Sequence, residues 1–358
     1  MKLAIIHDWL LQMGGAERVL IEFHSMFPEA PIYTLFTDSG FVKAYLPKAN
    51  IQTSFLQNIP FVTKIYPKLL PLIPSAIESF DLSEFDTVIS SSTAYSKGLV
   101  LKPKTKHLCY CYGPTRLLWD RAHEYTRGKE RSFSTKLAQH LLRIWDRQAA
   151  ERVDAFIAIS EAVKDRIRKY YHRDSKVIYP PLSYQAGFKS EAVPPKEYYL
   201  IVSRLYPSKN LEIAIRAFNK TRHKLVICGQ GPMKKDLQRM AEKNISFTGF
   251  VSDAKLAEYY KHCRAFIMPQ EEDFGLTSLE AMSFGRPVLA LRKGGACETI
   301  LEGITGEFFN DPIPEALADG LIRLNEHYPK YSPETIKKRA SEFSVERFRK
   351  EWKELLSL

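Results

Sequence analysis

Long apolar runs are missing from this 358-residue chain, since no stretch of 18 apolar residues occurs in it. A helix that crosses a bilayer needs about 20 such residues, so the sequence predicts no transmembrane helix. The first residues, Met1–Asp8, also lack the apolar segment and small-residue cleavage site of a signal peptide, and we expect a strand there. With no low-complexity stretch either, the pattern predicts a globular cytoplasmic protein.

Cysteine is also scarce, because the chain has only five, an odd number with scattered spacing. This argues against a disulfide framework, and we expect reduced thiols. Cys109 and Cys111 would share one strand face, but no second Cys/His pair lies nearby in the sequence to complete a metal site. The cysteines therefore do not predict a metal site.

Positive charge is concentrated in one part of the chain. The net charge is +11, and residues 101–180 carry 18 Lys/Arg against 9 Asp/Glu, whereas residues 1–100 carry 7 against 9. Such a segment can attract anionic lipid, a phosphorylated substrate or nucleic acid. Nucleic acid ranks last, because no recognisable binding module accompanies the charge. For residues 127–152 alone we expect a solvated helix face.

Short apolar runs rich in Val and Ile alternate with segments of helical period, which indicates an α/β fold with parallel sheets covered on both faces. The predicted strands are Leu3–His7, Thr87–Ser91, His107–Tyr112, Ala155–Ile159, Tyr198–Val202, Lys224–Cys228, Ala265–Met268 and Pro287–Ala290. The predicted helices include Ala16–Met26, Thr135–Arg152, Glu161–Tyr171, Leu211–Asn219, Met233–Lys243 and Ser278–Phe284.

Prolines divide the chain into two parts. Pro180 and Pro181 begin an irregular stretch, and proline favours extended chain and ends helices. We therefore predict one α/β domain over residues 1–180 and another over residues 181–340, with a ligand cleft between them. Residues 341–358 carry apolar side chains at helical spacing and are predicted to form a helix with one apolar stripe.

An acidic loop follows the predicted strand Ala265–Met268. Its three carboxylates, in residues 271–273, are costly to crowd together unless cations or sugar hydroxyls offset them. Gly275 permits a tight turn, after which a helix start would present backbone N–H groups to an anion. Glu280 fits a capping box with Thr277, but its carboxylate could also accept hydrogen bonds from both hydroxyls of a ribose.

Two other loops join a predicted strand to a predicted helix. Arg204 and Lys209 flank one of them, where a guanidinium can grip diphosphate oxygens and an ammonium adds a point charge. Gly14 and Gly15 lie in the other, and glycines let the backbone approach a ligand at a helix start. Their pattern is not G-x-G-x-x-G, which disfavours a dinucleotide site.

These motifs resemble those of family 4 glycosyltransferases, and within that family the chain is similar to O-antigen and capsule mannosyltransferases. The resemblance runs over nearly the whole chain. Its most specific part is the E-x7-E motif from Glu272 to Glu280, and further matches are Gly285–Val288, Gly294–Gly295 and Gly303–Gly306. It implies the GT-B fold, with two Rossmann-like domains facing across a cleft. Residues 1–180 would bind the acceptor, residues 181–340 the nucleotide sugar, and the helix in 341–358 would return to the N-terminal domain.

The resemblance also implies a role for each motif residue. Glu272 should contact the transferred sugar near the reacting carbon, while Arg204 and Lys209 neutralise the diphosphate as it departs. Glu280 should bind the ribose. The other implied donor contacts are Gly14, Gly15, Phe250, Val251, Phe274, Gly275, Leu276 and Thr277.

A second signature, residues 107–120, departs from the family pattern. Relatives usually have His where this chain has Tyr112, which can donate a hydrogen bond to a sugar hydroxyl. With a reference pKa of about 10, Tyr112 would not act as a base near neutral pH. The resemblance implies that an oxygen of the departing phosphate deprotonates the acceptor instead. Arg116 and Asp120 are predicted on the acceptor side, although a structural ion pair explains them equally well.

Residues 55–74 form an apolar stretch with four prolines and two lysines, Lys64 and Lys68. Core packing explains such a stretch, but the resemblance implies that this region lies near a lipid-linked acceptor. With the basic segment 101–180, it suggests peripheral contact with the inner face of an anionic membrane.

The sequence thus predicts a retaining glycosyltransferase that moves mannose from GDP-mannose onto a glycan or lipid-linked saccharide in surface polysaccharide synthesis. The nucleotide sugar is a substrate, so we expect no cofactor. No Asp-x-Asp motif lies in a suitable loop, and the resemblance to GT-B enzymes implies that no metal is required. A UDP-sugar is the alternative donor. The other interpretations are a nucleotide-sugar epimerase of the same fold and an inactive donor-binding partner subunit, which only Tyr112 favours.

Overall fold

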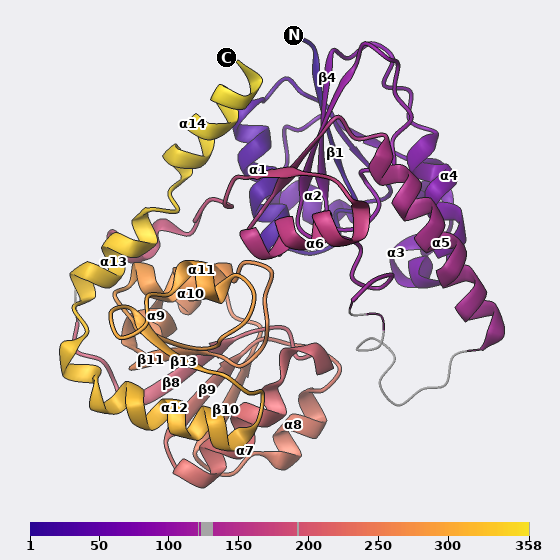
Figure 1. Ribbon diagram of the computed structural model, residues 1–358. Coiled ribbons are helices and arrows are strands. Elements are labelled where there is room, and N and C mark those ends of the chain that lie inside the picture. The colour runs from indigo at the N-terminus through magenta and orange to yellow at the C-terminus, as the bar shows by residue number, and fades with distance from the viewer. Residues whose placement is uncertain (121, 123–131, 192, 358) are drawn as a thin grey trace. The chain divides into compact units, whose positions relative to one another are not determined.

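Figure 1 presents the computed structural model, which describes residues 1–120, 122, 132–191 and 193–357. The chain divides into two compact units. Unit 1 contains residues 1–180 and 349–358, and unit 2 contains residues 181–348. Each unit is built around one sheet of parallel strands, which confirms the α/β fold class predicted from the apolar runs.

The sheet of unit 1 has seven strands in the order β3-β2-β1-β4-β5-β6-β7. They are β1 (Leu3–His7), β2 (Ile32–Thr34), β3 (Ile51–Thr53), β4 (Thr87–Ser92), β5 (Lys106–Cys111), β6 (Ala155–Ala158) and β7 (Ser175–Val177). The α-helices before β7 are α1 (Gly15–Met26), α2 (Ser39–Tyr45), α3 (Val62–Ile65), α4 (Ile73–Glu78), α5 (Phe133–Glu151) and α6 (Glu161–Tyr171).

Helices cover both faces of this sheet, because successive side chains of a strand point to opposite faces. Tyr110 of β5 packs edge-on against Phe23 of α1 on one face. Ile6 of β1 lies on the other face, in a buried core with Ile77 of α4. Leu56, Val62 and Ile73 also belong to this core, so the apolar stretch 55–74 is in part core packing.

The sheet of unit 2 has six strands in the order β10-β9-β8-β11-β12-β13. They are β8 (Tyr198–Val202), β9 (Lys224–Cys228), β10 (Ile245–Gly249), β11 (Ala265–Met268), β12 (Val288–Leu291) and β13 (Gly306–Phe309). The helices are α7 (Leu211–Thr221), α8 (Lys234–Met240), α9 (Asp253–His262), α10 (Leu276–Ser283), α11 (Ala296–Thr299), α12 (Pro314–Glu326) and α13 (Pro333–Ser341). Because β8 and β11 are parallel neighbours, the loops that follow them leave the same edge of the sheet.

The last helix, α14 (Val345–Leu356), returns to unit 1, as the resemblance implied. Its Trp352 is fully buried, with ring centroids 4.8 Å from Phe23 of α1 and 5.6 Å from Tyr110 of β5. Arg349 pairs with Glu22 of α1 at 2.5 Å. Figure 1 accordingly draws the yellow α14 beside α1. The apolar stripe read from the sequence is thus the face that completes unit 1.

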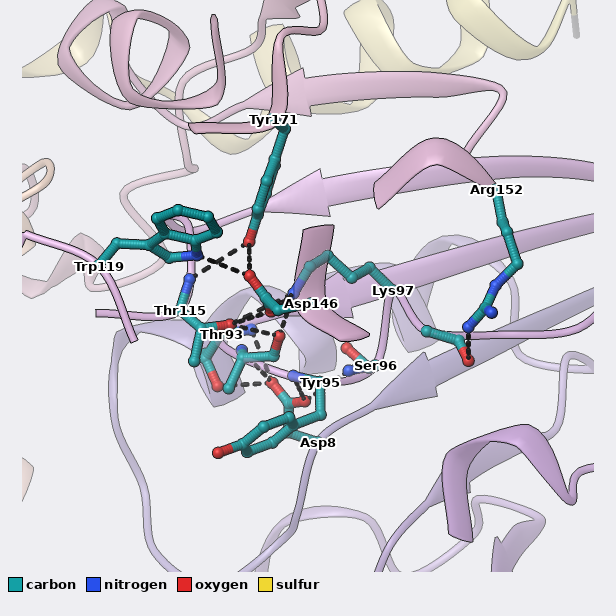
Figure 2. A network of polar contacts seen from close by, with 12 residues as sticks. Asp8, Thr93, Tyr95, Ser96, Lys97, Thr115, Trp119, Asp146, Arg152 and Tyr171 are labelled. Carbon is teal, nitrogen blue, oxygen red and sulfur yellow. Dashed lines mark hydrogen bonds and ion pairs between the residues drawn. The ribbon is translucent and has the colours of Figure 1, made fainter. Parts of the chain in front are cut away.

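A buried ion pair holds together the loops beyond β4 and β5, as Figure 2 shows. Lys97 Nζ lies 2.6 Å from Asp146 Oδ1, and both side chains are almost completely buried. The other oxygen of Asp146 accepts hydrogen bonds from Trp119 Nε1 at 2.7 Å and Tyr171 OH at 2.9 Å. These donors come from α6 and from the segment after β5, so Asp146 of α5 links three parts of unit 1.

Asp8, directly after β1, organises the loop after β4 in the same way. Its buried carboxylate accepts hydrogen bonds from four consecutive backbone N–H groups, those of residues 93–96, at 2.7 to 2.9 Å. The Thr93 hydroxyl adds a fifth hydrogen bond at 2.6 Å. A carboxylate so fully hydrogen-bonded fixes the backbone around it. The loop after β4 is therefore held against the end of β1.

His107 of β5 gives unit 1 a pH-dependent stability. Burial lowers the pKa of His107 from 6.5 to about 4, outweighing the opposite effect of nearby Asp154. Between these two pH values the unfolded chain binds a proton at His107 that the folded protein does not. The contribution of His107 to the free energy of unfolding is therefore fully present above pH 6.5 and is lost as the pH drops towards 4. This linkage amounts to roughly 3 kcal/mol at pH 4.

Denaturant unfolding of the wild type and His107→Gln, at several pH values from 7 to 4, tests this prediction. Tryptophan fluorescence reports on unit 1 alone, because the chain's four tryptophans, Trp9, Trp119, Trp145 and Trp352, all lie there. The wild type should lose about 3 kcal/mol more than the variant over this range. Exposed His172 offers a control, since His172→Gln removes an imidazole that is not buried in the fold. Parallel curves for wild type and His107→Gln would contradict the prediction.

Candidate functional site

The acidic loop of unit 2 connects the central strand β11 to α10. Gly275 occupies the position before the helix with φ of 90°, a left-handed conformation that glycine adopts without strain. A Cβ at Gly275 would also lie 3.2 Å from Met268 Sδ. The loop therefore turns sharply, and the first backbone N–H groups of α10 have no acceptor within the helix. This is the helix start that the sequence predicted for an anion.

Glu272 lies at the centre of a small polar cluster. Its Oε1 is 2.6 Å from Lys209 Nζ and accepts a hydrogen bond from Gln270 Nε2 at 2.9 Å. Lys209 belongs to the loop after β8, in a single 3₁₀ turn (Pro207–Lys209). The structure thus brings together two predicted site residues that are 63 positions apart in the sequence. Both side chains are mostly buried, so the pair is partly screened from water.

Gln270 is a member of this cluster that the sequence analysis did not identify. Its side chain is 3% exposed, and its buried oxygen has no hydrogen-bond partner among the described residues. A buried amide oxygen without a donor is uncommon in proteins and suits a ligand hydroxyl. The available signal was its position two residues before Glu272, just after the predicted strand Ala265–Met268.

Two glycines, Gly294 and Gly295, pack against the backbone of the acidic loop. Gly294 forms a bridge with Glu272, and the Gly295 N–H donates to the Glu272 carbonyl at 3.0 Å. With φ of 61°, Gly294 is left-handed, and a Cβ there would lie 2.2 Å from that carbonyl oxygen. No other residue type allows so close an approach. The segment Gly294–Gly295, noted in the sequence only as a family match, therefore positions Glu272.

Glu280 is buried in the second turn of α10 and does not form the capping box that the sequence suggested. That expectation was wrong because Gly275, not Thr277, precedes the helix, and no side chain caps its start. Instead, Tyr260 of α9 donates to Glu280 Oε2 at 2.8 Å. Burial, followed by the Glu280 carboxylate, raises the pKa of Tyr260 well above its usual value, so the phenol remains a donor.

The other predicted donor contacts in unit 2 differ in exposure. Arg204 is exposed, with its guanidinium carbon 5.7 Å from the centre of the Tyr206 ring. Phe250, which follows β10, is 77% exposed. Phe274 is buried against Phe343, so the loop would present its backbone to a ligand. The remaining contacts, Val251, Leu276 and Thr277, are half-buried.

In unit 1, Tyr112 belongs to a hydrogen-bonded chain of polar side chains. Its hydroxyl lies 3.0 Å from Ser91 Oγ and donates to the Ala16 carbonyl at 3.2 Å. His7 Nδ1 is 3.1 Å from the same Ser91 oxygen, and His7 Nε2 is 3.6 Å from Glu17 Oε1. Burial, with Glu17 next in effect among the causes that raise it, puts the pKa of Tyr112 well above 10. Tyr112 is therefore protonated at neutral pH.

This chain of contacts lies beside the predicted glycine loop. Gly14 precedes α1, which begins at Gly15, and a Cβ at Gly14 would lie 2.8 Å from Glu17 Oε2. Tyr112 thus braces the start of α1. His7, Glu17 and Ser91 were not identified from the sequence, although their positions at strand ends and beside the glycines gave a signal.

Of the remaining acceptor-side residues, Asp120 forms an ion pair with Arg166 of α6. This favours the structural explanation that the sequence left open for Asp120. Arg116 lies half-buried in the segment after β5. In the part of the chain that the structure describes, no group of three or more His, Cys, Asp or Glu side chains could hold a metal ion. Every helix there is too short or too polar to span a bilayer.

Two protein-family models match the chain. The model described as Glycosyltransferase Family 4 matches residues 13–184, and that described as Glycosyl transferases group 1 matches residues 185–342. Together they span residues 13–342, which include every predicted donor-side residue.

Two curated relatives and one solved structure illustrate the likeness. Alpha-1,3/1,6-mannosyltransferase ALG2 of Kluyveromyces lactis is 24% identical over 84% of this chain and 71% of its own length. A GDP-mannose-dependent alpha-(1-6)-phosphatidylinositol monomannoside mannosyltransferase of Mycolicibacterium smegmatis is 34% identical over 33% of this chain and 37% of its own. Anabaena HepE, solved with UDP and glucose, shares the fold with a TM-score of 0.74 at 19% identity, covering 100% of this chain and 99% of HepE. The first curated relatives are matched over 60% or less of their own length.

Proposed function

Because the chain belongs to glycosyltransferase family 4 and has the GT-B fold, we propose that it is a retaining glycosyltransferase. The donor is GDP-mannose, and the acceptor is a glycan or lipid-linked saccharide in surface polysaccharide synthesis. The observation that carries the proposal is the cluster of Glu272, Lys209 and Gln270 at the start of α10. It combines an anion, a cation and an unpartnered acceptor at one edge of a parallel sheet, where ligands of such sheets bind.

The cluster supports one arrangement of the donor. The first N–H groups of α10 and the Lys209 ammonium attract the diphosphate, with Arg204 as a second cation. As the bond to the sugar breaks, negative charge grows on the departing phosphate, and these groups stabilise it. Lys209 then lies between two anions, the phosphate and Glu272, and so holds the carboxylate beside the leaving group. No metal ion is required in this scheme.

Glu272 is proposed to face the sugar. Its carboxylate stabilises the positive charge that develops at the reacting carbon, and the free acceptor of Gln270 takes a sugar hydroxyl. Glu280, fixed by Tyr260, accepts from the ribose hydroxyls. The donor thereby contacts three carboxylate or amide side chains on one loop and helix.

Deprotonation of the acceptor does not need a protein base in this proposal. Tyr112 is unsuited to that role, because its raised pKa keeps it protonated. An oxygen of the departing phosphate takes the acceptor proton on the same face of the sugar, which retains configuration. Tyr112 and Arg116 remain the proposed acceptor-side residues, whereas Asp120, also predicted there, is held in a structural ion pair with Arg166.

GDP-mannose is preferred as donor because of the mannosyltransferases among the relatives, one of which is GDP-mannose-dependent by name. The experiment is to incubate the protein with GDP-mannose, GDP-glucose, UDP-glucose and UDP-galactose, with and without EDTA. Melting temperature and release of the nucleoside diphosphate are measured, and the sugar product is identified. Of the four nucleotide sugars, only GDP-mannose should raise the melting temperature and release its nucleoside diphosphate, GDP. The result should be the same with and without EDTA.

The other outcomes are equally clear. Preference for a UDP-sugar would replace the donor and keep the transfer reaction. An epimerised sugar in the absence of acceptor would replace the transferase by an epimerase. No response to any nucleotide sugar would overturn the proposal and favour an inactive partner subunit.

A further inference from the structure

Helix α5 of unit 1 carries a row of apolar side chains on its exposed face. Phe133 is 81% exposed, Leu137 47%, Leu141 56% and Ile144 46%. They recur at intervals of four, four and three residues, so they form one stripe along the helix. The opposite face of α5 packs into unit 1, where its buried residues are Leu142, Asp146, Ala149 and Ala150. Nothing in the described parts of the chain covers the stripe.

Basic side chains run beside this stripe. Lys136, His140, Arg143 and Arg147 recur at intervals of four, three and four residues, which places them in a neighbouring row of the same helix. The acidic residues of α5 offset only one member of this row, Arg147. Asp146 is buried with Lys97, and Glu151 pairs with Arg147 at 3.2 Å.

A surface hollow of about 330 Å³ lies where the two rows meet. Arg143 is one of its lining residues, with its Nε donating to the Leu118 carbonyl at 2.7 Å and its guanidinium carbon 5.9 Å from the centre of the Trp119 ring. The hollow therefore has an aromatic wall, from Trp119, and one guanidinium held in place, that of Arg143. Its lining residues are Trp119, His140, Arg143, Ile144, Arg147 and Gln148. Such a combination suits a phosphate attached to an apolar body.

We propose that α5 lies flat on an anionic lipid bilayer, with the apolar stripe at the boundary of headgroups and acyl chains. The basic row then meets the lipid phosphates, and one headgroup occupies the hollow. A helix with one apolar and one basic row is suited to such an interface. A second copy of this chain fits less well, because α5 offers no exposed acidic row to pair with Lys136, Arg143 and Arg147.

This assignment differs from the sequence analysis, which expected a solvated helix face over 127–152 and a membrane contact at 55–74. Periodicity alone could not distinguish the two faces of α5, because both carry apolar residues. The structure separates them by placing Leu142 inside and Leu141 outside. The inference goes beyond the proposed function, since it concerns a surface of unit 1 that needs no nucleotide sugar.

The test is co-sedimentation of the full chain with vesicles, without any nucleotide sugar. Phosphatidylglycerol mixed into phosphatidylcholine should bind the protein, and pure phosphatidylcholine should bind it much less. Leu137→Ser/Leu141→Ser should weaken binding about ten-fold or more. Lys136→Gln should weaken it about five-fold at low salt, and less as salt is raised.

Matched controls come from unit 2. Leu301 and Ile322 are 40% and 55% exposed, so Leu301→Ser/Ile322→Ser removes similar apolar surface elsewhere. Exposed Lys220 of α7 gives the control for charge, as Lys220→Gln. Both controls should bind vesicles like the wild type. All variants alter exposed side chains, and their melting temperatures will confirm that they fold.

Three results would overturn the proposal. The first is no binding to anionic vesicles, the second is undiminished binding by Leu137→Ser/Leu141→Ser, and the third is a dimer in sedimentation velocity that this variant dissociates. If the vesicle test fails, the proposed glycosyltransferase function is not affected, because vesicle binding is measured without a nucleotide sugar. A protein that binds vesicles but no nucleotide sugar would fail the proposed function alone.

Discussion

Replacing Glu272 with glutamine is expected to lower turnover of GDP-mannose about 100-fold, the usual effect of removing one charged group that stabilises a transition state. The substitution keeps the size of the side chain and removes its charge. It takes away the negative group proposed to face the reacting carbon, and it leaves the Lys209 ammonium without the partner now 2.6 Å away. The measurement is steady-state release of GDP, with binding of GDP followed separately by thermal shift.

The neighbouring carboxylate provides the control. Glu271 lies in the same loop, so Glu271→Gln removes an equal charge one residue away. Its turnover should remain within about three-fold of the wild type, because only a group aimed at the reacting atoms gains strength in the transition state. GDP should still bind to Glu272→Gln, since the helix start and Arg204 are unchanged. Equal effects of the two substitutions would mean that the loop acts through its total charge.

Asp146→Asn is expected to lower the free energy of unfolding of unit 1 by about 3 to 5 kcal/mol. The neutral side chain would leave the Lys97 ammonium buried, with the Ala94 carbonyl and Thr115 hydroxyl as its remaining acceptors. It would also weaken the hydrogen bonds from Trp119 and Tyr171. Tryptophan fluorescence during urea unfolding is the measurement, because it reports on unit 1.

A double substitution separates the buried charge from simple loss of packing. Lys97→Met/Asp146→Leu removes both charges and should be more stable than Asp146→Asn, since no unpaired ion remains. Glu151→Gln, at an exposed position of the same helix, should change stability by less than about 0.5 kcal/mol. A loss of less than about 1 kcal/mol in Asp146→Asn would show that water reaches Lys97.

Much of unit 2 was predictable because its chemistry lies in short segments. Apolar runs indicated β8 and β11 to the residue, and their parallel pairing brings the loops that follow them together. The resemblance assigned Lys209 and Glu272 to one site, and the pairing of β8 with β11 explains why they meet. Gln270 was missed because only the structure shows that its side chain is buried and that its oxygen has no hydrogen-bond donor. The capping box at Thr277 failed because Gly275 starts the helix earlier than the pattern suggested.

Unit 1 was harder to predict, because its polar contacts join distant residues. Nothing near Lys97 in the sequence points to Asp146, which lies 49 positions away on another element. The chain of His7, Ser91 and Tyr112 likewise joins three strand ends. Strands β2, β3 and β7 were also missed, since each has only three residues. Three residues are too few for a periodic signal.

The return of α14 to unit 1 affects the order in which the protein can fold during synthesis. Unit 2, residues 181–348, is translated completely before Arg349 and Trp352 appear. Domains generally fold as units while the chain grows. Unit 1 therefore leaves the ribosome first but remains without Trp352, so Phe23 and Tyr110 lack the ring that packs against them. The half of the protein that is made first becomes mature last, and it depends on chaperones or on its own partial stability while unit 2 is made.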